Sequence, residues 1–315
     1  MQVVTPELVH GKKVLLRLDI DVPIKDGKVV DDFRLKAGLP TLKMCLENAQ
    51  EVIIMGHIGR PKGFDPELSV EPIYDWLESQ GLSSHIECGK LKLLENLRFE
   101  VEEDNCDLAY ARQLASLGDV FVNEAFASYH ESASTTVLPT LLPHFAGLRF
   151  AEEVEKLTEV RDNPKHPLVA IIGGAKVEDK LPVVEAMSKI ADYVLVGGKL
   201  AGQSSDNILI AELNEVGTDV TAETIEKWKP IIREAKMIVW NGPLGKIEEP
   251  KNFQTHELAN IIIQSEAESV VGGGDTIGYL GKLGLLERFS FVSTGGGAML
   301  KFLIEGTLPT IEALK

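Results

Sequence analysis

Basic residues recur along the first half of the chain, each at or just after the end of an apolar run. An arginine fork can bind a phosphate or carboxylate through two hydrogen bonds, so a group of such residues in an acidic chain indicates a small anionic ligand. For the one histidine in this group, His57, the alternative interpretation is a packed imidazole whose hydrogen bonds are all made within the core. The residues are Arg34, His57, Arg60 and Arg98, with Asp19 and Asp21 closing the first apolar run.

Glycines gather at the ends of the apolar runs in the second half. Glycine lets backbone N–H groups approach a phosphate closely, and the N-terminus of a following helix adds positive potential. Plain turn chemistry could explain one cluster, but five on successive runs favour a nucleotide phosphate site. The clusters are Gly173-Gly174, Gly197-Gly198, Gly242, Gly272 to Gly274 and Gly295 to Gly297.

Two lysines follow the first glycine pair, in the stretch GGAKVEDK. Lys176 and Lys180 are four residues apart, which puts both ammonium groups on one face at the start of a helix. Cations there oppose the helix dipole, so they are poorly placed for stability alone. We interpret them as phosphate ligands, with two solvated surface lysines as the alternative.

The elements that must position these residues follow from the apolar pattern. Runs of consecutive apolar residues predict strands covered on both faces, as in a parallel sheet. The alternation of strands with helical stretches predicts an α/β fold of doubly wound parallel sheets. The predicted strands are 12–19, 51–55, 90–96, 119–123, 168–174, 192–198, 236–242, 269–275 and 291–297. The predicted helices are 33–48, 69–80, 107–117, 180–190, 221–235 and 253–267.

The length of 315 residues favours two domains. A charged stretch of helical spacing, ended by the prolines of NPKHP, marks the boundary. We expect an N-terminal domain over 1–150, a connecting helix over 151–166 and a C-terminal domain over 167–297.

Composition excludes several classes of partner. The net charge is −16, from 48 acidic and 32 basic residues, whereas nucleic acids and anionic membranes attract basic surfaces. Three widely spaced cysteines indicate neither a disulfide framework nor a metal site, and they fit a reducing cytoplasm. No signal peptide or membrane-length apolar run is expected. The Walker GxxxxGK[ST] loop and a strand-linked GxGxxG are missing, which disfavours Walker-type ATPases and dinucleotide-binding domains.

Nine sequence segments, taken together, resemble the phosphoglycerate kinase family. They are RLDIDVP, DDFRLKAGLPT, MGHIGRPKG, LLENLRF, VNEAF, IIGGAKVEDK, VWNGPLG, VGGGDT and VSTGGGA, in the family's order over nearly the whole chain. The resemblance implies two lobes joined by a helix. The first would bind 3-phosphoglycerate or 1,3-bisphosphoglycerate, and the second ADP or ATP with Mg²⁺. It also implies that the tail 298–315 packs back on the first lobe, and that the chain is a cytoplasmic monomer.

The resemblance assigns roles in the first lobe by matching residues. Asp19, Asp21 and Arg34 would bind the glycerate end. His57, Arg60 and Arg98 would hold the phosphate that is not transferred. Catalysis would fall to Arg34, Lys176, Gly296 and Gly297, around the migrating phosphoryl group.

The second lobe would bind the nucleotide. Lys180 would reach its phosphates, Asp275 the magnesium, Thr276 the phosphate chain and Glu248 the ribose hydroxyls. The remaining predicted nucleotide ligands are Gly174, Gly197, Gly198, Asn241, Pro243 and Gly274.

The chain departs from the family's pattern at several points. Glu131 stands where the family has an arginine, and Asp21 replaces an asparagine. Lys199 replaces a glycine, the stretch after it is shortened, and so is the stretch between WLESQ and KLLENLRF. Two alternatives to phosphoglycerate kinase activity therefore stay open. One is a kinase for a related acyl phosphate with a less charged or amine-bearing group, and the other is a nucleotide-binding protein without turnover.

Overall fold

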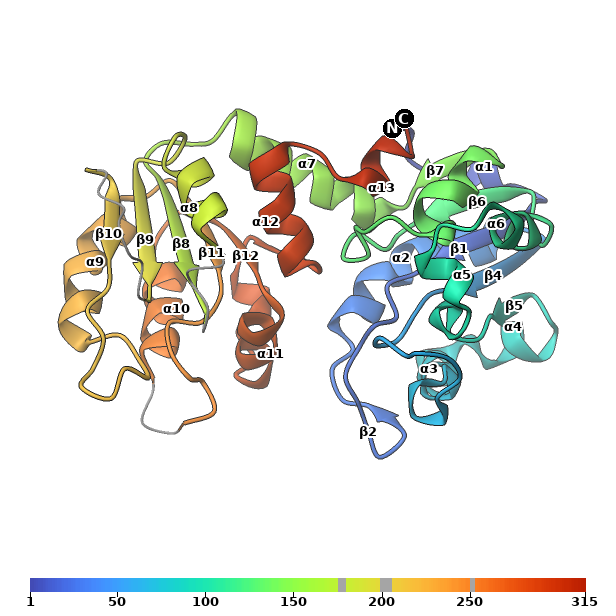
Figure 1. Ribbon diagram of the computed structural model, residues 1–315, viewed down its shortest axis with the longest axis horizontal. Helices are drawn as coiled ribbons and strands as arrows, with labels where there is room; N and C mark the ends of the chain where they lie inside the picture. The colour runs from blue at the N-terminus through green and yellow to red at the C-terminus, as the bar shows by residue number, and fades with distance from the viewer. Residues whose placement is uncertain (175–179, 199–205, 250–252) are drawn as a thin grey trace. The chain divides into compact units, whose positions relative to one another are not determined.

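The computed structural model describes the chain except for residues 175–179, 199–205 and 250–252. It divides into two compact units, Met1–Val154 with Thr307–Lys315, and Glu155–Gly306. The unit boundary falls within helix α7, Leu148–Asp162. Figure 1 labels most of the helices and strands of each unit. Among the described residues, no helix has both the length and the apolar character that a membrane span requires.

Unit 1 contains a five-stranded parallel sheet of order β5-β4-β1-β6-β7. The central strand β1 is buried from Val14 onward, which explains its unbroken apolar run. The main strands are β1 (Lys13–Arg17), β4 (Glu51–Met55), β5 (Leu91–Leu93), β6 (Val120–Asn123) and β7 (His144–Ala146), and a hairpin is formed by β2 (Ile24–Lys25) and β3 (Lys28–Val29).

Helices surround this sheet and bury apolar faces against it. The long helix α2 buries Leu35, Leu42 and Leu46 in the same core cluster as Val14 and Leu16 of β1. The α-helices are α1 (Pro6–Val9), α2 (Phe33–Asn48), α3 (Glu71–Leu77), α4 (Ser83–Glu87), α5 (Val101–Asp104), α6 (Leu108–Ala115) and α13 (Pro309–Glu312). Shorter 3₁₀ or π turns are η1 (Pro66–Leu68), η2 (Glu78–Leu82), η3 (Leu97–Phe99), η4 (Ala133–Val137) and η5 (Leu138–Thr140).

Unit 2 contains a six-stranded parallel sheet of order β10-β9-β8-β11-β12-β13. Helix α8 packs against α12, and α9 packs against α10. The strands are β8 (Leu168–Gly173), β9 (Tyr193–Gly197), β10 (Ile208–Ile210), β11 (Met237–Asn241), β12 (Glu268–Gly272) and β13 (Phe291–Val292). The helices are α8 (Leu181–Met187), α9 (Ala222–Glu234), α10 (Gln254–Gln264), α11 (Gly274–Lys282), η7 (Leu286–Arg288) and α12 (Gly296–Glu305).

The expected tail 298–315 is divided between the units, which corrects its predicted extent. Helix α12 belongs to unit 2, where it buries Met299, Phe302 and Leu303. Gly306, in the left-handed conformation at φ 76°, ends this helix. Only Thr307–Lys315 groups with unit 1.

Both sheets reverse their strand order at one point, next to the first strand of each unit. In unit 1 this point lies between β1 and β6, and in unit 2 between β8 and β11. In open parallel sheets, ligands bind outside the carboxyl ends of the strands at such a point. Each unit therefore has one edge where a site is expected.

Candidate functional site

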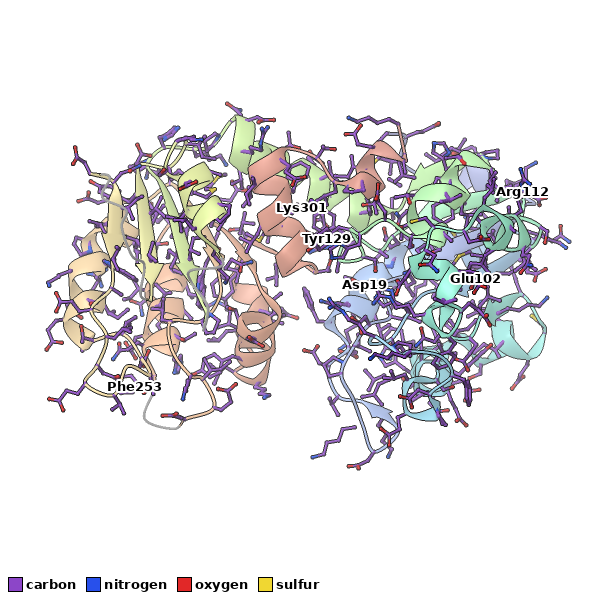
Figure 2. The ribbon with its side chains drawn as sticks, viewed as in Figure 1. Asp19, Glu102, Arg112, Tyr129, Phe253 and Lys301 are labelled. Carbon is purple, nitrogen blue, oxygen red and sulfur yellow. The ribbon has the colours of Figure 1, made fainter. Side chains whose placement is uncertain are left out.

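The first group of site residues lies at the carboxyl end of β1. Nη1 of Arg34, on α2, donates to the Asp21 carbonyl at 2.7 Å and lies 3.8 Å from Oδ1 of Asp19. Asp19 is 4% exposed (it is labelled in Figure 2), and its buried Oδ2 has no hydrogen-bond partner among the described residues. Burial raises the pKa of Asp19, and the Arg34 charge opposes that rise. A buried, unpaired carboxylate oxygen is suited to accept a ligand hydroxyl.

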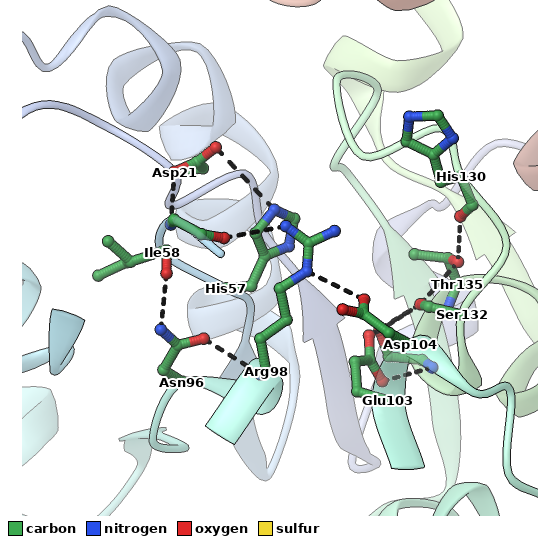
Figure 3. A network of polar contacts seen from close by, with 12 residues as sticks. Asp21, His57, Ile58, Asn96, Arg98, Glu103, Asp104, His130, Ser132 and Thr135 are labelled. Atoms are coloured by element: carbon green, nitrogen blue, oxygen red, sulfur yellow. Dashed lines mark hydrogen bonds and ion pairs between the residues drawn. The ribbon is translucent and has the colours of Figure 1, made fainter. Parts of the chain in front are cut away.

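The second group comes from the loops after β4 and β5, and Figure 3 shows it at close range. The Arg98 guanidinium donates to the Gly59 carbonyl at 2.9 Å and to Oδ1 of Asp104 at 3.0 Å. Oδ1 of Asp21 accepts from the Gly59 N–H at 2.9 Å, which ties the β1 and β4 loops together. Nε2 of His57 lies 4.0 Å from Oδ2 of Asp21. These contacts hold the side chains of Asp21, His57 and Arg98 around one cavity.

This cavity of unit 1 has a volume of about 170 Å³. Arg34, His57, Arg60 and Arg98 all line it, so the structure brings together the four basic residues predicted to bind the substrate. Asp21 lines it as well, whereas Asp19 is not among the lining residues. The departure residue Glu131 also faces this cavity.

The lining charges of the cavity balance. Four arginines meet four acidic residues, and burial with the surrounding arginine charges lowers the pKa of His57 well below its ordinary value, so that the imidazole is neutral. An anion entering this cavity gains less from net charge than it would in a purely basic site. The arginines are Arg17, Arg34, Arg60 and Arg98, and the acids are Asp21, Glu103, Asp104 and Glu131.

Sequence reasoning missed the buried floor of this cavity. Arg17 and Glu103 are each 1% exposed, and Ser134 links them: its Oγ donates to Glu103 and accepts from Nε of Arg17 at 2.9 Å. Asp104, the partner of Arg98, was missed as well. An arginine inside the otherwise apolar run VLLRL (14–18) was the available signal, because such a residue must find buried partners.

In unit 2, glycines pack the strand ends against one another. A Cβ on Gly242 would lie 2.2 Å from the Gly173 carbonyl oxygen, and one on Gly296 would lie 2.5 Å from Cα of Gly273. The Gly174 N–H donates to the Pro243 carbonyl at 2.7 Å. These glycines therefore serve close backbone approach at the strand switch point, beyond the needs of a turn.

Lys180 lies at this edge. Its Nζ donates to the Gly173 carbonyl at 2.5 Å and to Oδ1 of Asn241 at 3.3 Å. Burial lowers the pKa of the ammonium group, and Asp275 opposes this effect. Asn241 in turn donates to the Gly296 carbonyl at 3.3 Å. The arrangement joins β8, β11 and the start of α12 around one lysine.

The N-terminus of α11 supplies the last group. Gly274 begins the helix and exposed Asp275 stands in its first turn. The Thr276 hydroxyl is buried and has no hydrogen-bond partner among the described residues. Helix N-termini attract anions, and an orphan hydroxyl beside one is suited to a phosphate oxygen.

Three other predicted nucleotide ligands lie on β9 and on the segments that follow β9 and β11. Gly197 ends β9 opposite Gly173 of β8, and a Cβ there would lie 2.4 Å from Leu244. Gly198 follows it, and Glu248 is exposed on the segment after β11. Lys176 and Lys199 lie outside the described residues.

A metal site is not preformed in the described part of the chain. No group of three or more His, Cys, Asp or Glu residues there could hold an ion. Mg²⁺ commonly takes one or two carboxylates together with phosphate oxygens and waters. Asp275, exposed beside the helix N-terminus, fits that mode of binding.

One doubly wound unit has an arginine-lined cavity and the other has a glycine-packed strand edge, which is the arrangement expected of a two-unit α/β phosphotransferase. The family model for phosphoglycerate kinase matches residues 5–205 and 202–306. The chain belongs to the phosphoglycerate kinase family.

Individual relatives agree with this assignment. The chain is 34% identical to the phosphoglycerate kinase of Haemophilus influenzae (strain PittGG) over 370 residues, covering 97% of this chain and 96% of the relative. It is 32% identical to that of Leptospira biflexa serovar Patoc over 378 residues, covering 96% of each. Both alignments are longer than the 315-residue chain, so these relatives carry segments that this chain lacks.

Solved structures agree as well. The phosphoglycerate kinase of Coxiella burnetii superposes with a TM-score of 0.80 at 30% identity, covering 97% of this chain and 96% of that one. That of Pyrococcus horikoshii OT3 gives 0.85 at 28% identity, covering 100% and 98%. The predicted fold class is therefore confirmed.

Proposed function

We propose that this chain transfers a phosphoryl group between 1,3-bisphosphoglycerate and ADP, giving 3-phosphoglycerate and ATP. The observation that carries the proposal is the convergence of Arg34, His57, Arg60 and Arg98 on one cavity. Unit 2 supports it with Lys180, Asn241 and the start of α12 at the edge where a nucleotide is expected.

The roles follow from charge and position. Arg34, fixed by the Asp21 carbonyl, neutralises a carboxyl or acyl phosphate oxygen. Arg60, Arg98 and His57 hold the distal phosphate, and Asp19 accepts the hydroxyl of the glycerate. Phosphoryl transfer needs positioning and electrostatic stabilisation more than covalent help, and both acceptors are already anionic, so no general base is required.

The nucleotide's phosphates bind at the strand ends of unit 2. Lys180 and the amides at Gly296 and Gly297 stabilise the migrating group, with Lys176 as a further ligand. Asp275 would hold Mg²⁺, which would supply positive charge at the phosphates, and Thr276 donates to a phosphate oxygen. Gly174, Gly274 and Pro243 shape the edge, and Glu248 with Gly197 and Gly198 borders the sugar and base. We further propose that the protein is a cytoplasmic monomer.

A coupled assay with 3-phosphoglycerate and Mg-ATP tests the proposal. We expect turnover by the native chain, and loss of at least 100-fold in Lys176→Ala, in line with the removal of one transition-state ligand. Lys189→Ala, at an exposed lysine after α8, is the matched control and should retain the native rate. Equal background rates from all three proteins would reject the proposal.

A second function is favoured by one observation, the balanced charge of the cavity. Glu131 and Asp21 suit an acyl phosphate whose distal end is less anionic or carries an amine. Turnover of such a substrate in the same assay, with none for 3-phosphoglycerate, would select this alternative.

A further inference from the structure

The floor of the unit 1 cavity contains a buried hydrogen-bond network centred on Arg17. Its guanidinium donates to the Leu18 carbonyl at 3.0 Å, to Oγ of Ser134 at 2.9 Å and to Nδ1 of His57 at 2.8 Å. An arginine stays protonated at any accessible pH, so it can only donate. Nδ1 of His57 must therefore be the acceptor in the third bond.

The acceptor role fixes where the imidazole proton lies. A neutral imidazole carries one hydrogen, and when Nδ1 accepts, that hydrogen is on Nε2. Nε2 lies 4.0 Å from Oδ2 of Asp21, beyond the range of a hydrogen bond. His57 lines the cavity, so this N–H can be donated to an oxygen of a bound ligand.

We propose that Arg17 is a positioning residue that holds His57 as the neutral Nε2–H tautomer, so that the imidazole donates a hydrogen bond to an anionic oxygen of the ligand. The inference deepens the proposed function, and it depends on that function only for the identity of the ligand. Arg17 itself stays on the floor of the cavity and acts through His57.

The surroundings of His57 keep it neutral. It is 8% exposed, and burial is the largest cause of its lowered pKa. The charged groups that face it are Arg17 from β1, Arg34 from α2, Arg60 from the loop after β4 and Arg98 from η3, all of which lower the pKa, with Asp21 at 4.0 Å as the nearby acid. Protonation would place a further cation among four arginines and break the bond from Arg17.

Glu103 compensates the positive charge of the buried Arg17 side chain. It is 1% exposed and accepts from Oγ of Ser132 at 2.8 Å and from the Ser134 N–H at 3.0 Å (Figure 3). Because Ser134 also accepts from Arg17, the carboxylate charge reaches the guanidinium through one hydroxyl. Buried charges persist when they are compensated in this way.

Nitrogen-15 NMR of the full chain tests the inference directly. His57 should show the Nε2–H pattern with no protonation between pH 5.5 and 8, assigned by its loss in His57→Gln. An Nδ1–H pattern, or a titration midpoint within that range, would overturn the inference. The NMR measurement needs no substrate. If the Nε2–H pattern is present but the chain shows no turnover, only the proposed function is refuted.

Variants then separate positioning from simple structural support. In Arg17→Met we expect His57 to titrate within the pH range, and the KM for 3-phosphoglycerate at pH 8 to rise about tenfold with a smaller change in kcat. Arg17→Lys, which still donates, should restore the Nε2–H pattern. Arg112→Met, at an exposed arginine of α6, should match the native chain. An unchanged His57 spectrum in folded Arg17→Met would contradict the proposal.

A milder variant covers the case in which Arg17→Met fails to fold. Ser134→Ala leaves the arginine in place but removes the partner of its Nε. We expect a partial loss of the Nε2–H pattern and an intermediate KM. A native spectrum and a native KM in Ser134→Ala would mean that this network does not set the tautomer.

Discussion

The two units form their candidate sites by different means, on sheets that share a strand order except for one extra edge strand in unit 2. Unit 1 places charged side chains at its strand ends, and Arg17, Arg34 and Arg98 are fixed there by hydrogen bonds. Unit 2 places glycines at its strand ends, and Gly173, Gly242 and Gly296 bring backbone into close contact. The topology therefore decides where a ligand can bind, and the residues at the strand ends decide which ligand it is.

This contrast has a consequence for specificity. The phosphate chain of a nucleoside triphosphate is the same whatever the base, so backbone groups can bind it without selecting between bases. A small organic anion differs in shape and charge, so side chains must recognise it. Departures that change the substrate are therefore expected in unit 1, and Glu131 lines its cavity.

The largest effect is expected from removing a fixed charge in unit 1. Arg34→Met should lower kcat about 100- to 1,000-fold, because a preorganised donor to the reacting group is lost. The coupled assay measures this, with Arg112→Met as the matched arginine control. A loss below tenfold would mean that Arg34 does not touch the reacting group.

The next prediction concerns the pH dependence of stability, which we expect to arise from a buried carboxylate of unit 1. In unit 1, Glu124 follows β6 and caps α7: its carboxylate accepts from the Arg149 and Phe150 N–H groups at 3.1 and 3.0 Å, and from the Thr41 hydroxyl. Burial raises its pKa to about 7 from an ordinary 4.5, against those hydrogen bonds. In unit 2, β11 ends in Asn241, which cannot titrate.

The sign of this effect follows from linkage. The folded chain binds the Glu124 proton more tightly than the unfolded chain, so its stability falls as pH rises from about 4.5 to about 7. The expected loss is about 3 kcal/mol. Urea unfolding of the native chain and Glu124→Gln at several pH values isolates this slope as the difference between the two profiles. Parallel profiles would contradict the assignment.

In unit 2, we expect a methyl group added at a strand-end glycine to lower stability and nucleotide binding, whereas in unit 1 the sensitive change is the loss of a charge. Gly242 has φ 95°, and its Cβ would lie 2.2 Å from a backbone oxygen, so Gly242→Ala should cost about 1–3 kcal/mol of unfolding free energy. It should also reduce stabilisation by ATP in a thermal melt. Gly278→Ala, inside α11 with open space around it, is the control and should be neutral or slightly stabilising. Equal melts for both variants would refute the close-packing argument.

Much of this fold could be predicted from the sequence, because buried parallel strands leave long apolar runs. The runs at 51–55 and 168–174 correspond to β4 and β8 within one residue. Short edge strands such as β7 and β10, three residues each, carry too little pattern to be recognised. Helix α12 was predicted to pack on the first unit but belongs to unit 2. The apolar face of a helix shows that it is buried, but not which element it packs against.

The site was predictable to a similar degree. Arg34, His57 and Arg98 were found because they follow strands, and parallel topology brings strand ends together. Arg17 falls within the predicted strand 12–19, and Glu103 lies between the predicted strand 90–96 and the predicted helix 107–117. Their function depends on partners more than 30 residues away, which no local pattern encodes.

The smallest expected effect tests whether a single residue of the unit 1 cavity, Glu131, changes its affinity for the substrate. Glu131 lines the same cavity as Arg60 and Arg98, at the position where the resemblance to the family implies an arginine. Glu131→Arg adds a charge-assisted donor and removes a repulsive carboxylate, so the KM for 3-phosphoglycerate should fall roughly tenfold. Glu131→Gln removes only the repulsion and should give part of that gain, while Glu102→Arg, outside the cavity lining, controls for net charge. Because screening weakens exposed charges, the gain should shrink at high salt. An unchanged KM in Glu131→Arg would show that this carboxylate lies away from the bound substrate, and that the balanced charge of the cavity does not set its specificity.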